Sequence, residues 1–254
     1  MTDDENYRNT ADFFEARYEH KDYGKEAAKF SNFVSAVHPG ARSLLDVACG
    51  AGNHLQHLKN SYRVEGIDLN ARLLEIAATR LDGAPLHIGD MCNFEVGRKF
   101  DLVTCLFGSI AMSRDVENMR NATRTMAKHL EHDGLLFIEP YLTPGVYREG
   151  EVVHNFREHG DRKLSWMYVM HRRDNVATWE IHWIVGQRDG QVLHFVENEE
   201  YALFETQECV DAMADAGLHA ICHPYGLHGY GAIIGRRKPW TDLEIGRMND
   251  AFAR

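Results

Sequence analysis

A pair of glycines and a later aspartate have the types and spacing needed to hold a ligand that contains a ribose. Gly50 and Gly52 follow a short apolar run, and because glycine has no Cβ the backbone at both positions can approach a ligand closely. Asp68 ends the next apolar run, 18 residues after Gly50. A carboxylate at this point can accept hydrogen bonds from both hydroxyls of a ribose, as acidic residues do in dinucleotide-binding folds. The N-terminus of a helix behind the glycines would add positive potential for a carboxylate or a phosphate.

Asp90 and Met91 follow a third short apolar run and extend this candidate site. The Asp90 carboxylate can accept from an exocyclic amine such as adenine N6, and the Met91 N–H can donate to a ring nitrogen. We expect the ligand to cross the carboxyl ends of the strands, where open α/β sheets bind ligands, and therefore to be bordered by Ala48 and Leu106. The letters from Gly50 read G-A-G-N-H-L, without the third glycine of the dinucleotide fingerprint, which argues against NAD or FAD.

Strand-like runs alternate with helical segments across the first half of the chain. The predicted strands are Ser43–Ala48, Tyr62–Asp68, Leu86–Ile88, Phe100–Phe107 and Gly134–Glu139, and the predicted helices between them include Ala71–Leu81 and Val116–Leu130. This alternation predicts right-handed crossovers and a mainly parallel sheet with both faces covered. Two later strands, near Leu218–His223 and Gly231–Arg236, are expected to pair as a hairpin. The predicted fold is α/β, with a Rossmann-like doubly wound sheet of seven strands.

The remaining segments are expected to belong to one domain that spans residues 1–254. Residues 1–40 carry apolar side chains at helical spacing and predict an N-terminal helical cap. Residues 147–203 contain three long, aromatic, roughly alternating runs, which predict an inserted antiparallel β meander on the substrate side. After Pro239 we expect a surface helix or loose chain.

The composition excludes several classes of protein. Hydrophobic residues make up 44% of the 254 residues, which is enough for a sizeable core and excludes a disordered chain. The net charge of −10 argues against nucleic acid as a partner, because binding to phosphates depends on basic charge. No apolar run reaches the roughly 18 residues of a membrane span, and the first residues are acidic and polar, which predicts neither a membrane partner nor a signal peptide.

The cysteines and histidines suggest neither disulfides nor a metal. The five cysteines form no CxxC pair, which predicts reduced thiols and a cytoplasmic location. His54 and His57 share a helix face, but no third ligand follows at a suitable spacing, so we expect no metal site.

The motifs around the glycines resemble those of class I S-adenosylmethionine-dependent methyltransferases over roughly residues 40–140. The stretch LLDVACGAG, which ends at Gly52, is similar to the first motif of that class. The resemblance implies S-adenosyl-L-methionine as the cofactor, Asp68 as its ribose acid and Gly89-Asp90-Met91 as its adenine motif. Aromatic N-terminal residues cover the cofactor in the resembling family, which implies this role for Tyr18.

Within that class the chain is most similar to the amino-sugar N,N-dimethyltransferases of antibiotic biosynthesis, whose substrates are nucleotide-linked. The stretches that carry the likeness include Lys21-Asp22-Tyr23, Leu86–Met91, Gly97-Arg98-Lys99-Phe100, Phe137-Ile138-Glu139-Pro140 and Asn175-Val176-Ala177-Thr178. Substrate-side positions depart from that family. Met112 stands where its members carry a His or Tyr, Tyr141-Leu142 replaces a Trp pair, and the loop Gly226–Gly231 lacks the Arg of the family's late loop.

The resemblance implies methyl transfer to a small molecule, with the amine nitrogen of an amino-sugar-like acceptor as the expected site. Because the sulfonium makes the methyl carbon electrophilic, the protein has to place a nucleophile in line with the C–S bond. An amine must also lose a proton before it attacks, to a side chain or to water. The residues expected to line the acceptor are Tyr7, Met112, Tyr141 and Tyr230, and the candidate bases are His182 and His228.

Three other functions remain open at this point. The nearest is an O-methyltransferase of another small natural-product scaffold, whose oxygen nucleophile would need a base more strongly. A nucleotide-dependent oxidoreductase fits the glycine loop less well because the third glycine is missing. A non-catalytic cofactor-binding protein would be compatible with Met112 in place of a polar residue. The expected partner is the small-molecule acceptor, and a homodimer is left open.

Overall fold

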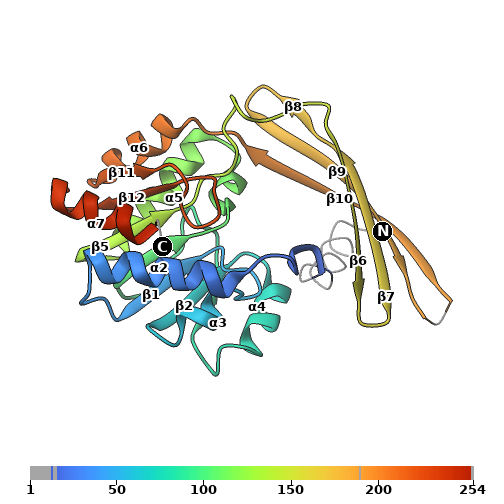
Figure 1. Cartoon of the computed structure of the whole chain (residues 1–254), viewed down its shortest axis with the longest axis horizontal. Coiled ribbons are helices and arrows are strands. Elements are labelled where there is room, and N and C mark those ends of the chain that lie inside the picture. The colour runs from blue at the N-terminus through green and yellow to red at the C-terminus, as the bar shows by residue number, and fades with distance from the viewer. Residues whose placement is uncertain (1–12, 14–15, 189, 253–254) are drawn as a thin grey trace. The chain divides into compact units, whose positions relative to one another are not determined.

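Apolar runs from the first half of the chain and the C-terminal hairpin form one seven-stranded sheet (Figure 1). Its strands are β1 (Ser43–Val47), β2 (Arg63–Asp68), β3 (Leu86–Ile88), β4 (Phe100–Cys105), β5 (Leu130–Ile138), β11 (His219–His223) and β12 (Ala232–Arg236). They lie in the order β11-β12-β5-β4-β1-β2-β3. The first five strands are parallel, whereas β12 is antiparallel to β5 and β11 is antiparallel to β12. The predicted Rossmann-like, mainly parallel sheet of seven strands is confirmed.

The computed structural model describes residue 13 and residues 16–188 and 190–252, and the chain divides into two units. The larger unit contains the seven-stranded sheet and comprises Tyr23–Thr143 and the chain from Phe204 onward. The smaller unit comprises the N-terminal residues through Asp22 together with Pro144–Leu203. Within the described ranges, no helix has both the length and the apolar character needed to cross a membrane.

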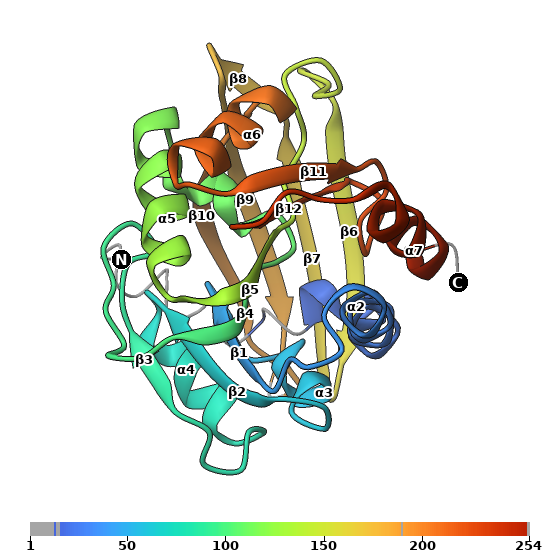
Figure 2. The same cartoon turned by 90° about the vertical axis from the view of Figure 1, so that its left-hand side faces the viewer.

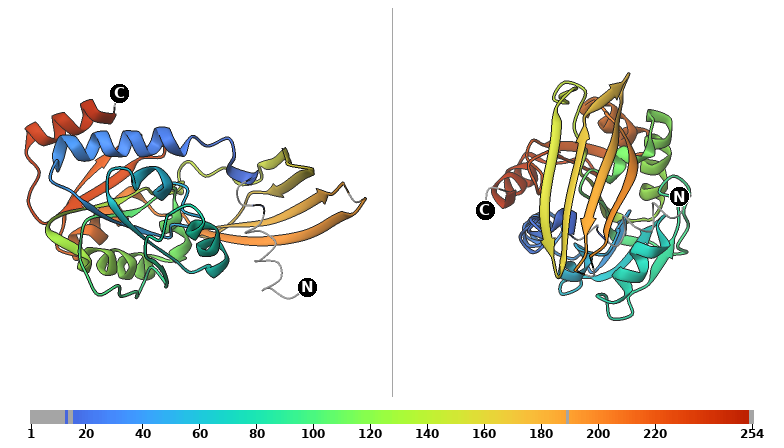
Figure 3. Two further views of the ribbon diagram at one scale, coloured as in Figure 1. Left: turned by 90° about the horizontal axis from the view of Figure 1, so that it is seen from below. Right: turned by 90° about the vertical axis from the view of Figure 1, so that its right-hand side faces the viewer.

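Helices cover both faces of the seven-stranded sheet, as its parallel pairing requires. They are α2 (Tyr23–Val37), α3 (Leu55–Leu58), α4 (Ala71–Ala78), α5 (Val116–Lys128), α6 (Thr206–Asp215) and α7 (Asp242–Phe252), and a 3-10 helix, η1 (Ser109–Ser113), follows β4. Helices α5 and α6 lie on one side of the sheet, and α2 and α7 lie on the other (Figures 2 and 3). Phe30 and Phe33 of α2 pack against Phe137 of β5, with ring centroids 5.3 and 5.6 Å apart. These buried rings hold α2 on the sheet.

The smaller unit contains an antiparallel sheet. Its strands are β6 (Val152–His159), β7 (Arg162–Val169), β8 (His171–Arg173), β9 (Val176–Gly186) and β10 (Val192–Ala202). They lie in the order β10-β9-β7-β6, with β8 paired to β9. The predicted antiparallel meander is therefore present, but the sequence pattern did not predict β6, because this strand has no buried residue to create an apolar run. The single domain over 1–254, the cap role of residues 1–40 and the substrate-side role of residues 147–203 stay predictions.

A buried ion pair ties the N-terminal segment to this antiparallel sheet. The two terminal guanidinium nitrogens of Arg17, Nη1 and Nη2, donate to the Glu199 carboxylate on β10 at 2.7 and 3.0 Å. Glu197 lies 3.7 Å from the same guanidinium and accepts the indole N–H of Trp183 at 3.0 Å. A bidentate pair of this kind fixes orientation as well as distance, because the planar guanidinium matches the carboxylate.

The chain after Pro239 forms the helix α7, one of the two expected alternatives, but one face of this helix packs into the core of the larger unit, which was not expected. Met248 and Phe252 are buried, and the Phe252 ring stacks on Phe33 and His223 with centroids 5.2 and 4.2 Å apart. The sequence signal was weak because only a few apolar residues are spaced among charged ones in this segment.

Replacement of Phe252 by alanine tests this contribution of α7 to the core. We expect Phe252→Ala to lower the free energy of unfolding by about 3–5 kcal/mol, because it removes a buried ring that touches two others. Leu243→Ala on the same helix is the matched control. The Leu243 side chain is 65% exposed, and a change of less than about 0.5 kcal/mol is expected for it. Urea unfolding curves measure both, and equal losses for the two variants would contradict the assignment.

Candidate functional site at the carboxyl edge of the parallel strands

The loop after β1 has left-handed backbone at three positions. Ala48, Gly50 and Gly52 have φ values of 59°, 54° and 73°. A Cβ at Gly52 would also lie 3.1 Å from the Ala77 Cβ and 3.2 Å from a methyl carbon of Leu81, so glycine is needed there for space as well as for conformation. Helix α3 behind the loop is only one turn long. The N–H groups of the loop itself, and not a long helix dipole, must therefore supply the positive potential expected here.

Asp68 connects this glycine loop to the end of β2. Its Oδ2 accepts the Gly50 N–H at 2.7 Å, and its Oδ1 accepts the Asn70 N–H at 2.8 Å. Burial raises the pKa of Asp68, and backbone hydrogen bonds offset this only in part. Asn70, and not Asp68, caps helix α4. Because each carboxylate oxygen has a second lone pair, Asp68 can still accept from two hydroxyl groups.

Asp90 lies at the neighbouring strand end. In the register of β2 and β3, Asp68 is opposite Ile88, and the Gly89 N–H donates to the Asp68 carbonyl at 3.1 Å. The Asp90 side chain is exposed, and its Oδ1 accepts the Cys92 N–H at 2.8 Å. The structure thus brings the two aspartates predicted for ribose and adenine to adjacent strand ends.

Two exposed apolar side chains at these strand ends were not predicted from the sequence. Leu69, directly after Asp68, is 66% exposed, and Ile88, at the end of β3, is 69% exposed. Met91 is half-buried. Large apolar side chains left in solvent beside polar groups are typical of a binding surface, here one suited to a flat base. Leu69 could have been found from the sequence, because it is a large apolar residue immediately after Asp68, which ends β2.

Asp46, on β1, is a buried carboxylate close to the glycine loop. The Thr104 hydroxyl donates to its Oδ1 at 2.7 Å. Burial raises the pKa of Asp46 to about 6; the charges of Asp68 and Glu139 raise it too, and the contacts with His54 and Thr104 act in the opposite direction.

A second buried carboxylate reaches the same region from α2. Glu26 Oε2 lies 2.8 Å from His54 Nε2, just after the glycine loop, and both side chains are at least nine-tenths buried. Asp46 and Glu139 also interact electrostatically with His54, so three carboxylates surround this imidazole, and Asp68 adds its charge beside Asp46. Such an environment repels a pyrophosphate and attracts a cation. It therefore suits a ligand with a sulfonium and an ammonium group better than a dinucleotide.

Glu139 anchors the other half of this edge. It is fully buried at the end of β5. Its Oε2 accepts the Phe107 N–H after β4, and its Oε1 accepts the Leu227 N–H of the β11–β12 loop, both at 3.0 Å. The Nδ1 atom of His228 lies 3.0 Å from Oε1. Although burial raises the pKa of Glu139, the contact with His228 and the Phe107 N–H outweigh it and hold the pKa below its ordinary value.

Aromatic rings surround His228. Its ring centroid lies 5.5 Å from that of Phe107 and 5.0 Å from that of Tyr230, and Tyr230 lies 6.3 Å from Tyr141. A Cβ at Gly108 would lie 2.8 Å from the Tyr141 ring, so the glycine makes room for this side chain. The structure therefore brings Tyr141, Tyr230 and His228 together. Sequence reasoning did not predict that Glu139 holds these loops together. The signal that could have indicated it is an acidic residue at the end of an apolar strand.

The remaining predicted residues are more dispersed. Leu106 is buried directly after β4, and Met112 on η1 is 50% exposed. Tyr18 and His182 belong to the smaller unit, where burial raises the pKa of Tyr18 to about 12 and His182 is exposed on β9. Tyr7 lies outside the described residues. The roles assigned to these residues stay predictions.

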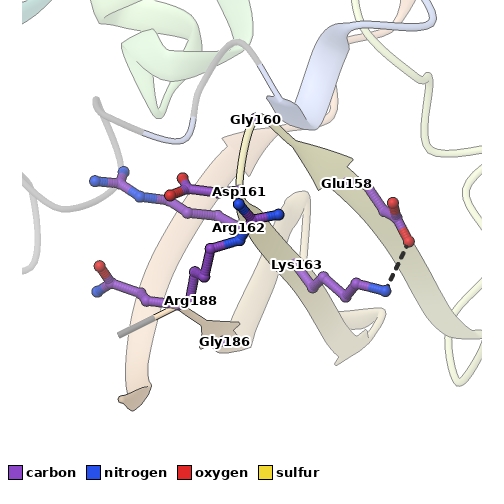
Figure 4. A pocket seen from close by; sticks show the side chains of 8 residues that line it. Glu158, Gly160, Asp161, Arg162, Lys163, Gly186 and Arg188 are labelled. Carbon is purple, nitrogen blue, oxygen red and sulfur yellow. Dashed lines mark ion pairs between the residues drawn. The ribbon is translucent and has the colours of Figure 1, made fainter. Parts of the chain in front are cut away.

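The smaller unit has a hollow of its own between two hairpin ends of its sheet (Figure 4). Its lining residues are Glu158, Gly160, Asp161, Arg162, Lys163, Gly186, Gln187 and Arg188. Lys163 and Glu158 pair at 3.0 Å, and both are well exposed. The lining carries charges of both signs, and no cluster of catalytic groups is evident among these described residues.

The parallel sheet, the glycine loop and the acids along one edge define the class of this protein, an S-adenosylmethionine-dependent methyltransferase. A family model described as a methyltransferase domain matches residues 44–134. The dTDP-4-amino-2,3,4,6-tetradeoxy-D-glucose N,N-dimethyltransferase of Saccharopolyspora spinosa is 35% identical over 218 residues, which cover 85% of this chain and 87% of the relative. The chain therefore belongs to the family of amino-sugar N,N-dimethyltransferases.

Solved structures agree with this family assignment. The crystal structure of Streptomyces venezuelae DesVI is similar with a TM-score of 0.85 and 32% identity, over 90% of this chain and 98% of DesVI. CalS10, an amino pentose methyltransferase from Micromonospora echinaspora solved with bound S-adenosylmethionine, has a TM-score of 0.80 and 33% identity, over 87% of this chain and 94% of its own. S-adenosyl-L-methionine is the cofactor of this enzyme, and the expectation of a methyltransferase is confirmed.

The raised pKa of Asp46 predicts opposite effects of Asp46→Asn on stability and on cofactor affinity. The folded-state pKa is about 6, and an unfolded aspartate titrates near about 4. The native protein thus holds an extra proton between these values, so the contribution of Asp46 to stability falls as the pH rises through this window. At pH 8, Asp46→Asn should raise the free energy of unfolding by about 1–3 kcal/mol.

Below about pH 4 this gain should disappear, because Asp46 is then neutral in both states. The same variant should bind the cofactor more weakly, since it removes a negative charge near the glycine loop, where the cationic donor is expected to bind. Urea unfolding at several pH values and calorimetric titration measure the two effects. A gain in stability that does not vary with pH would contradict the assigned burial of charge.

Removal of the Asp68 carboxylate tests the ribose assignment. Asp68→Ala should weaken binding of S-adenosylhomocysteine by about 1–3 kcal/mol, because the ligand hydroxyls lose a charged acceptor. Asp211→Ala, at an exposed position on α6, is the control and should leave the affinity unchanged. Isothermal titration measures both affinities, and an unaltered affinity of Asp68→Ala would exclude the assignment.

Proposed function

We propose that this enzyme transfers methyl groups from S-adenosyl-L-methionine to the amine nitrogen of a dTDP-linked amino sugar, in two successive steps. The observation that carries the acceptor class is the 35% identity, over 85% of this chain, to a curated dTDP-amino-sugar N,N-dimethyltransferase. The similarity extends well beyond the methyltransferase-domain match at residues 44–134 and so includes the segments outside the cofactor motifs.

The edge of the parallel strands supplies the cofactor half of this proposal. The residues proposed to bind the cofactor are Tyr18, Ala48, Gly50, Gly52, Asp68, Asp90, Met91 and Leu106, and to these we add Leu69 and Ile88. Asp68 would accept from the ribose hydroxyls, and Asp90 from the adenine amine. Leu69 and Ile88 would cover the base with apolar surface, and the buried carboxylates near the glycine loop would attract the positive charges of the donor.

The acceptor half is proposed to lie over β4 and β5, where Tyr141 and Tyr230 are neighbours and Met112 is exposed. A thioether cannot take a proton, so Met112 fits an amine nucleophile, which needs less help from a base than a hydroxyl does. Tyr7 remains a proposed acceptor contact. The five cysteines are free thiols, which supports the cytoplasmic location that forms part of this proposal.

The proposed reaction is tested with two acceptors that differ at one atom. The purified enzyme is incubated with S-adenosylmethionine and either dTDP-4-amino-2,3,4,6-tetradeoxy-D-glucose or the sugar with a hydroxyl at that carbon. We expect mass spectrometry to detect one and then two added methyl groups on the amine, and none on the hydroxyl sugar. Methylation of the hydroxyl sugar alone would favour the O-methyltransferase alternative, and no methylation of either would contradict the acceptor class.

A further inference from the structure

We propose that His228 is the catalytic base that takes the proton of the acceptor amine, and that Glu139 is the residue that positions it. This inference rests on the proposed amine methylation and adds to it the identity of the proton acceptor.

The two nitrogens of His228 have different surroundings. Nδ1 is buried and lies 3.0 Å from Glu139 Oε1. No side chain or backbone group among the described residues forms a hydrogen bond with Nε2, and this atom is not sealed from solvent as Nδ1 is. A carboxylate next to Nδ1 favours the tautomer with the hydrogen on Nδ1, which leaves the lone pair of Nε2 to accept a proton.

A carboxylate and a phenol are the titratable groups that the described residues place beside the His228 ring. Glu139 faces it from β5, and Tyr230 faces it from the same loop, while the third neighbouring group, Phe107, is apolar. Behind Glu139, its electrostatic neighbours include Asp46, His54 and Cys105. Because its pKa is lowered, Glu139 is ionised at neutral pH and can stabilise the imidazolium that forms when Nε2 takes a proton.

The strand order puts His228 at the correct end of the cofactor edge. The adenosine residues follow β2 and β3, and the glycine loop follows β1, so the next position along the edge is the end of β4. Phe107 follows β4 and contacts the His228 ring. His182, the other candidate base, is exposed on β9 and therefore lacks comparable protection from water. Its Nε2 lies 3.0 Å from the Glu180 carboxylate.

The protonated amine of the acceptor gives one proton to His228 Nε2 and becomes neutral. Its lone pair then forms the N–C bond to the methyl carbon, and the C–S bond breaks with its electron pair left on sulfur. The product amine carries the positive charge that the sulfonium loses, and the imidazolium returns its proton to solvent before the second methylation.

The pH dependence of kcat distinguishes a proton acceptor from a merely structural residue. His228→Gln keeps a hydrogen-bonding amide but cannot take a proton, and His132→Gln, at an exposed position on β5, is the control. The acceptor is dTDP-4-amino-2,3,4,6-tetradeoxy-D-glucose. At pH 7 we expect His228→Gln to lower kcat by about a hundredfold or more. The acid limb of the pH–kcat profile of His228→Gln should move to higher pH. The kcat values of this variant and the wild type should therefore converge in alkaline buffer, where the amine loses its proton unaided.

Titration with S-adenosylhomocysteine checks that His228→Gln is folded and binds the cofactor product as the wild type does. An unchanged profile, or a loss of kcat that is equal at every pH, would overturn the base assignment and leave the proposed function intact. Absence of turnover by the wild-type enzyme would overturn both. His132→Gln should retain the wild-type profile.

Discussion

Buried negative charge at one edge of the parallel sheet is the constraint on which the site depends. Parallel strands present their carboxyl ends at the same edge, so the acids at or near the ends of β1, β2 and β5 are forced into one neighbourhood. Burial of a carboxylate is costly unless donors or a cation compensate it. Asp46 has the Thr104 hydroxyl, Asp68 has two backbone N–H groups, and Glu139 has two N–H groups and His228. The compensation is incomplete at Asp46 and Asp68, whose pKa values are raised, and a cationic donor can complete it.

The same hydrogen bonds also shape the loops that form the site. Asp68 accepts the Gly50 N–H, and Glu139 accepts the Phe107 N–H. Gly50 and Phe107 both have left-handed backbone. Phe107 is not a glycine, and a non-glycine residue in this region is strained unless its surroundings enforce it. The carboxylates therefore act twice, first by fixing the loops and then by setting the electrostatic potential. A site of this kind exchanges some stability of the free protein for affinity toward its ligand.

The two halves of the edge are suited to different tasks. The ends of β2 and β3 combine exposed aspartate with exposed Leu69 and Ile88, an arrangement suited to the hydroxyls and the flat ring of a nucleoside. The ends of β4 and β5 combine aromatic rings with one imidazole on a buried carboxylate. Family membership explains why the first half matches the motifs of related methyltransferases. The second half contains the positions, such as Met112, at which the sequence analysis expects this chain to depart from its family.

The sequence by itself determined the parallel sheet, the glycine loop and the position of Asp68 and Asp90 at adjacent strand ends. These follow from patterns within a few residues of each other, because an apolar run defines a strand and the residue after it must lie at the carboxyl edge. It did not reveal β6, whose residues are never buried, or the core role of Phe252. The pairing of Glu139 with the loop at Leu227 and His228 joins residues some 88 positions apart. Only the tertiary structure decides such a contact, because it depends on β12 lying antiparallel beside β5, and no local pattern encodes which strand becomes a neighbour.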